Sequence, residues 1–187
     1  MERDITIPPD NTSHNSENKS FKNIKTFKKA CEVLDINYND VNSVIEDIIK
    51  FSNSKSAAAM FKLSIIRRAL NLGQDLPFTK NSKNPLIYYP YNPCVNKNST
   101  LYNDQLKSGK IEIIGKIKVG KTECNILGGD TTCCYANLGS YGIYNSLVGC
   151  ATREIAEHFS KYFGMTIIEA KYSNLEDFEI ITNYYKN

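Results

Sequence analysis

Residues 115–122 carry the clearest chemical pattern in this chain. They read GKIKVGKT, which matches G-x-x-x-x-G-K-[ST] at every fixed position. In a phosphate loop of that kind, backbone amides wrap the phosphates, Lys121 reaches the β- and γ-oxygens, and Thr122 holds magnesium. The loop must lie between a buried strand and a helix, because the N-terminus of the helix supplies part of the anion site.

The residues within and after this match favour a β-hairpin instead. The four middle residues, KIKV, alternate between polar and apolar types as an extended strand does, and Gly128-Gly129 follows too soon for a supporting helix. Ile114-Gly115 interrupts the alternation and indicates a bulge, and Gly120-Lys121 suits a turn. We therefore expect a hairpin, and nucleotide binding is the third of three hypotheses about function.

A second candidate for chemistry is Cys150, which is followed eight residues later by His158. Cys150 precedes an expected helix, whose N-terminal dipole lowers the pKa of a thiol. Eight residues along a helix span about 12 Å, which is too far for a nucleophile to contact its base. We expect His158 on the flank of the helix, no catalytic residue and no enzymatic activity.

The six cysteines show no CxxC spacing, and the two histidines complete no familiar zinc pattern. Neither a metal nor a cofactor is expected. The 187 residues carry a formal charge of only +3, with both signs mixed and lysine far commoner than arginine, so nucleic acid is not an expected partner. No stretch approaches the roughly 20 apolar residues of a membrane span, and residues 1–22 lack the apolar centre of a secretory signal. We expect synthesis in a cytoplasm and no membrane partner.

Helical signals dominate the first part of the chain. Thr26 suits the cap of one helix, and Asn39 or Asp40 suits the cap of a second. A third helix is predicted from Ser54 or Ser56 to residue 72. Its apolar face is so wide that contacts on two sides are expected. The residues left for solvent on it are Lys62, Arg67, Arg68 and Asn71.

Strand signals follow Gly109, after a stretch from residue 74 to 110 without regular pattern. Beyond the hairpin we expect strands over 131–138 and 141–148, then a helix that Thr152 caps and Gly164 ends. The last twenty residues fit a strand or a helix. The order predicts an α+β fold: N-terminal helices packed on a small, mainly antiparallel sheet, with a C-terminal helix and a polar N-terminal arm. Residues 23–187 are one expected domain.

Residues 1–22 are polar and rich in Asn and Ser. One interpretation is a disordered tail, since such a segment buries too little apolar surface to offset the entropy of ordering. The other is a docking arm, in which Ile5 and Ile7 alternate like a strand that Pro8 and Pro9 stop. An arm of this kind can add to the exposed sheet edge of a partner.

A second docking candidate is the tyrosine patch formed by Tyr88, Tyr89 and Tyr91 around Pro90. Three tyrosines beside prolines can form a stacking or peptide-recognition surface. The alternative, which we favour, is that they pack a long loop onto the core.

Four segments occur in an order that resembles a known family. They are residues 25–34 (KTFKKACEVL), 61–73 (FKLSIIRRALNLG), 87–90 (IYYP) and 152–163 (TREIAEHFSKYF). Together they resemble small uncharacterised proteins encoded by phages and prophages of gut Bacteroidota, of crAss-like or related phages. Gln74 stands where that family usually has tryptophan, and residues 1–22 look like an addition.

The resemblance implies a phage setting but no activity, so no catalytic residue is carried over. The leading hypothesis is a non-enzymatic virion protein: a head decoration, head fibre or neck component docked through its N-terminal arm. Its expected partners are capsid or neck proteins and further copies of itself, and its expected location is the virion. The competing hypothesis is an intracellular phage protein that binds components of host defence or replication.

Overall fold

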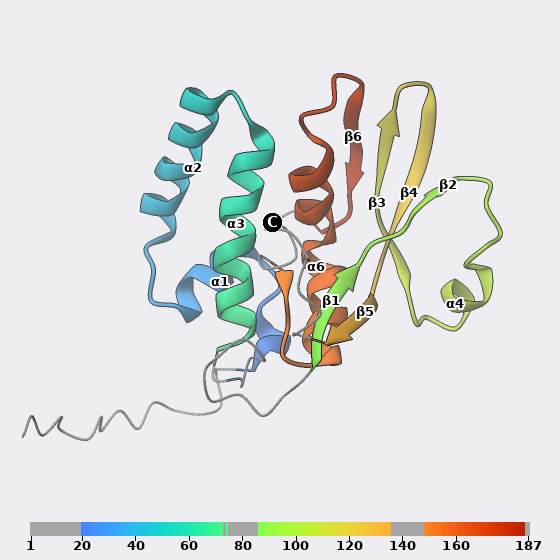
Figure 1. Cartoon of the computed structure of the whole chain (residues 1–187), viewed down its shortest axis with the longest axis horizontal. Coiled ribbons are helices and arrows are strands. Elements are labelled where there is room, and N and C mark those ends of the chain that lie inside the picture. Colours follow the sequence, from blue (N-terminus) through green and yellow to red (C-terminus); the bar gives the residue numbers. More distant parts are fainter. Residues whose placement is uncertain (1–19, 73, 75–85, 136–147, 186–187) are drawn as a thin grey trace, which may run out of the picture.

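The computed structural model describes residues 20–72, 74, 86–135 and 148–185, and the fold is α+β as predicted. Figure 1 shows three layers, in which the long C-terminal helix lies between the N-terminal helices and the strands. The helical elements are η2 (Phe21–Asn23), α1 (Phe27–Val33), α2 (Tyr38–Ser52), α3 (Lys55–Leu70), α4 (Asn103–Lys107) and α6 (Arg153–Tyr172). The strands are β1 (Leu86–Tyr91), β2 (Cys94–Asn96), β3 (Glu112–Val119), β4 (Thr122–Gly128), β5 (Asp130–Tyr135) and β6 (Phe178–Asn183).

The described strands form two antiparallel sheets. One pairs β1 with β5, and the other has the order β2-β4-β3-β6. Helix α6 packs against both sheets, and α3 packs on the other side of α6. The larger core cluster joins α1, α2, α3 and α6, while Met165 and Ile168 of α6 share a smaller cluster with Ile114, Ile117 and Ile126 of the four-stranded sheet.

Three of the predicted helix caps are confirmed. The side chains of Thr26, Ser54 and Thr152 each accept a hydrogen bond from a backbone amide in the first turn of their helix. The prediction for α2 was wrong by two residues or more, because Asn37 caps it and accepts from the amide of Asn39 at 2.9 Å. The expectation that α3 is contacted from two sides is confirmed, since α1 and α2 lie against one side and α6 against the other.

Asn71 corrects the predicted solvent face of α3. It is the C-cap of a helix that ends at Leu70, and only 5% of it is exposed. Its amide nitrogen donates to the carbonyls of Arg67 at 2.8 Å and Gly149 at 3.2 Å, and its amide oxygen accepts from Ala151 N at 2.8 Å. The prediction failed because helical periodicity gives the face of a residue but not a partner 80 positions away. Asn71 thus ties α3 to the segment that leads into α6.

The hairpin prediction for residues 115–122 is confirmed. Strands β3 and β4 pair antiparallel, and Gly120, with φ of +59°, lies in the turn between them. The register shifts between Ile113 and Gly115, which is the predicted bulge. A side-chain carbon on Gly115 would lie 2.4 Å from Met165 Sδ, so the bulge lies where α6 presses on the sheet.

The prediction of irregular structure over 74–110 was wrong for β1, β2 and α4. Pro90 hid the signal of β1, since a proline has no amide to donate to a sheet. In β1, Pro90 lies opposite Thr131 of β5. On its other side Tyr88 exchanges two backbone hydrogen bonds with Cys150, at 2.8 and 3.0 Å.

Gly164 does not end the C-terminal helix, which continues to Tyr172. A side-chain carbon there would lie 2.3 Å from Asn92 Nδ2 and 2.4 Å from Ile114 Cδ1, so glycine is needed for close packing and not as a helix stop. The last part of the chain contains the end of α6 and then β6, which pairs with β3. The strand predicted over 131–138 is described as β5, up to residue 135. Of the strand predicted over 141–148, all but Val148 lies outside the described residues.

Candidate functional site: a lysine-lined cleft on α6

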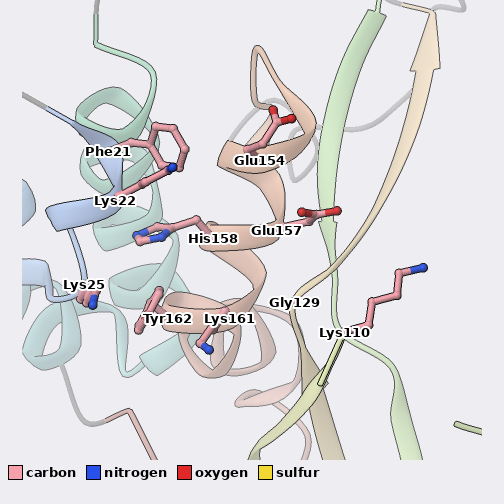
Figure 2. A pocket seen from close by; sticks show the side chains of 10 residues that line it. All are labelled: Phe21, Lys22, Lys25, Lys110, Gly129, Glu154, Glu157, His158, Lys161 and Tyr162. Carbon is pink, nitrogen blue, oxygen red and sulfur yellow. The ribbon is translucent and has the colours of Figure 1, made fainter. Parts of the chain in front are cut away.

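Helix α6 presents one polar face, and that face lines a cleft of about 400 Å³. Glu157 and His158 follow Glu154 by three and four residues, and Lys161 follows them by four and three, so all of them lie on the same side of the helix. Figure 2 shows Phe21, Lys22 and Lys25 on one side of α6 and Lys110 and Gly129 on the other. The cleft therefore joins segments that are far apart in the sequence.

Buried contacts beneath the cleft fix the position of α6. Ser160, which is fully buried, donates to the carbonyl of Tyr91 at 3.0 Å and accepts from the amide of Gly129 at 3.1 Å. Asn92 Nδ2 reaches the carbonyls of Leu127 and Ser160, both at 2.9 Å. These bonds hold α6 against both sheets, and the cleft has a rigid floor.

His158 connects α6 to Phe21 and Ile24 near the start of the described chain. Its Nε2 lies 2.7 Å from the carbonyl of Ile24, so this nitrogen carries the proton and donates it. The ring of Phe21 meets the ring of His158 edge-on, with 5.5 Å between centroids. Burial lowers the pKa of His158, and the nearby cations Lys25 and Lys161 lower it further. The neutral imidazole is a structural link between η2 and α6.

Tyr162 lines the cleft and packs against Tyr185. Their rings meet at 5.1 Å, and Lys25 Nζ and Lys161 Nζ lie 5.3 and 5.5 Å from the centroid of Tyr162. Lys161 also pairs with Glu112 at 3.1 Å, and the hydroxyl of Tyr185 donates to the same carboxylate. Burial and this bond to Glu112 raise the pKa of Tyr185.

Cys150 and His158, the nucleophile and base considered above, each contact a different partner. Cys150 is fully buried, its thiol faces the carbonyl of Val148 at 3.3 Å, and burial raises its pKa. A buried thiol of raised pKa lacks the thiolate that a nucleophile needs. His158 bonds to Ile24 instead, as described above.

The phosphate-loop match has a different geometry from a nucleotide site. Lys121 and Thr122 are exposed, and Thr122 begins strand β4 where such a site requires a helix. Among the described residues, no group of three or more His, Cys, Asp or Glu side chains is placed to hold a metal ion. None of the described helices is both long and apolar enough to cross a membrane.

The structure describes three of the seven predicted docking residues. Ile5, Ile7, Pro8 and Pro9 lie outside the described residues. Tyr88, Tyr89 and Tyr91 all belong to β1, where alternation places Tyr88 on the opposite face from the other two. Tyr88 and Tyr89 are half-buried against the larger core cluster, whereas Tyr91 is 45% exposed.

Sequence reasoning did not group the four lysines of the cleft, which are Lys22, Lys25, Lys110 and Lys161. The spacing on α6 indicated one polar face, but nothing in the sequence placed residues 22–25 and 110 beside it. Comparison with protein families, with curated proteins and with solved structures finds no match to this chain.

Proposed function

We propose that the chain is a non-enzymatic structural or accessory component of a bacteriophage particle, held in place through its N-terminal residues. The phage setting rests on the four segments that resemble the Bacteroidota phage family. The proposed partners are capsid or neck proteins and further copies of the chain. The proposed mode of attachment rests on the contacts that residues 20–24 make with the folded unit.

Residues 20–24 are held against α6, and this observation is the main support for the proposal. Ser20 caps η2, Phe21 packs edge-on against His158, and the carbonyl of Ile24 accepts from the same imidazole. Residues 20–24 therefore belong to the folded unit, and residues 1–19 are attached at a fixed point beside the cleft. A short polar segment with a fixed origin is suited to bind an exposed sheet edge of a neighbouring protein.

The lysine-lined cleft favours one alternative, an intracellular phage protein that binds a host or phage factor. The two functions differ in where the chain is found after infection. Particles purified through a density gradient are analysed by mass spectrometry, and the chain is quantified against the major capsid protein. We expect a constant ratio across the particle peak. Detection of the chain solely in the soluble fraction of the lysate would support the alternative and contradict the proposal.

A further inference from the structure

The cleft on α6 holds more positive charge than its own carboxylates neutralise. Lys22, Lys25, Lys110 and Lys161 line it, against Glu154 and Glu157. Of the four lysines, Lys161 is the one with an ion pair to a described carboxylate, that of Glu112. Lys22, Lys25 and Lys110 are exposed at the rim. Three ammonium groups are therefore available to a ligand.

Both glutamates in the cleft already have partners. The carboxylate of Glu154 is bonded by its own backbone amide and by Thr152, and these bonds lower its pKa. Glu157 faces Arg153 at 3.7 Å, one helical turn earlier. Lys22 also lowers the pKa of Glu154, so this carboxylate offsets part of the charge of that lysine. Both carboxylates repel a ligand that carries negative charge along its whole length.

Aromatic side chains line part of the cleft. Phe21, His158 and Tyr162 pack against one another in edge-on and tilted contacts, and the ring of Tyr162 has two lysines over it. A nucleobase needs an open ring face for stacking, and the two lysines over Tyr162 leave less of that face open. Aliphatic and peptide groups can pack against ring edges.

We propose that this cleft binds an acidic segment of a partner protein. The carboxylates of the segment pair with Lys22, Lys25 and Lys110, and its apolar atoms lie against Phe21 and Tyr162. Charge complementarity and the mixed polar and aromatic lining favour a peptide over a polyanion. The absence of arginine from the described lining of the cleft agrees, because nucleic-acid phosphates are commonly held by bidentate guanidinium groups. This inference goes beyond the proposed function and does not depend on it.

Fluorescence anisotropy with the full chain tests the inference. The probe is a fluorescein-labelled peptide of about twelve residues in which three or four acidic residues are separated by leucine and alanine, and the competitor is single-stranded oligo-dT of similar length. We expect the double variant Lys22→Glu/Lys25→Glu to bind the peptide about tenfold more weakly than the wild type, because two favourable pairs become repulsive. The control, Lys116→Glu/Lys121→Glu, changes net charge equally at exposed positions of the hairpin and is expected to bind within about twofold of the wild type.

Three outcomes would overturn the inference. They are no peptide binding at about 1 mM protein, equal losses in the two double variants, and tighter binding of oligo-dT that is lost in the cleft variant. The melting temperature of each variant is measured first. Should Lys22→Glu/Lys25→Glu not fold, Lys22→Gln/Lys25→Gln removes the same charges without reversing them, and the same comparison applies.

Discussion

At the residue scale, the side chain of Asn71 joins parts of the described chain that are far apart in the sequence. It links the end of α3 to Gly149 and Ala151, whose neighbour Cys150 pairs with β1. One amide therefore connects the helical layer to the two-stranded sheet. A buried amide with all its partners satisfied also specifies this arrangement over others, because any shift leaves polar groups unpaired.

We predict that Asn71→Leu lowers the free energy of unfolding by about 3 kcal/mol, since the amide of Ala151 and the carbonyl of Gly149 lose their buried partner. Urea denaturation monitored by circular dichroism measures the change. Arg68→Ala, three residues earlier on the exposed side of α3, is the control and is expected to stay within about 0.5 kcal/mol of the wild type. A loss below about 1 kcal/mol for Asn71→Leu would show that the link is not important for stability.

His158 gives the folded chain a defined pH dependence. Its pKa in the folded protein lies below the ordinary 6.5 because of burial and because Lys25 and Lys161 face the ring. The unfolded chain then binds a proton more readily, and stability falls as the pH drops below about 6.5 and levels off below the folded pKa.

The prediction is that wild-type protein loses more stability between pH 7.5 and pH 5 than His158→Gln does. Thermal unfolding at a series of pH values measures both. Glu169 acts in the opposite direction, since burial raises its pKa, but it is present in both proteins and cancels in the difference. Parallel profiles of stability against pH would show that folding does not shift the pKa of His158.

At the scale of elements, the close approach of α6 to the strands decides the shape of the cleft. Gly164 lets the helix lie against Asn92 and Ile114, and Ser160 one turn earlier bonds to Tyr91 of β1 and to Gly129, which lies between β4 and β5. Side chains larger than these would push α6 outward and separate Lys161 from Glu112.

We expect Gly164→Ala to destabilise the protein by about 1–2 kcal/mol, because overpacking outweighs the better helix propensity of alanine. A double-mutant cycle with Asn92→Ala locates the cause. In the Asn92→Ala background the penalty should shrink by about 0.5 kcal/mol or more, since the nearest obstructing atom is gone. Gly109→Ala is the control: a side-chain carbon there meets open space, and although the φ of +71° strains alanine, that cost should be the same in both backgrounds. Stabilisation by Gly164→Ala would refute the packing argument.

Elements with local signals were predictable from the sequence, and elements with remote partners were not. The caps at Thr26, Ser54 and Thr152, the alternation of β3 and the turn to β4 are encoded within a few residues. The strand β1 was missed because its partners in β5 lie 39 to 49 residues away and Pro90 masks its propensity. The glycine of α6 was misread because Gly164 is explained by Asn92, which only the fold brings near.

At the scale of the whole molecule, the topology of the fold determines where the candidate site lies. Helix α6 forms the middle layer, η2 returns along one side of it, and the chain before β3 passes along the other (Figure 1). The cleft therefore gathers lysines from positions 22, 25, 110 and 161, which no local pattern connects. For the same reason the sequence predicted the fold class well and the candidate site poorly.

The anchored start of the described chain also makes the proposed function testable with a clean truncation. Removing residues 1–19 keeps Ser20, Phe21 and the bond from His158 to Ile24, so the folded unit is expected to retain its melting temperature. Removal of residues 1–23 also deletes Phe21, and a lower melting temperature is expected for that variant.

The most direct measurement compares how much full-length and 1–19-deleted chain is incorporated into purified phage particles, quantified by mass spectrometry against the major capsid protein. The account predicts that the full-length chain is incorporated and that the deleted chain, with an unchanged melting temperature, is reduced by about tenfold or more. Equal incorporation of the two chains, or absence of the full-length chain from the particles, would contradict it.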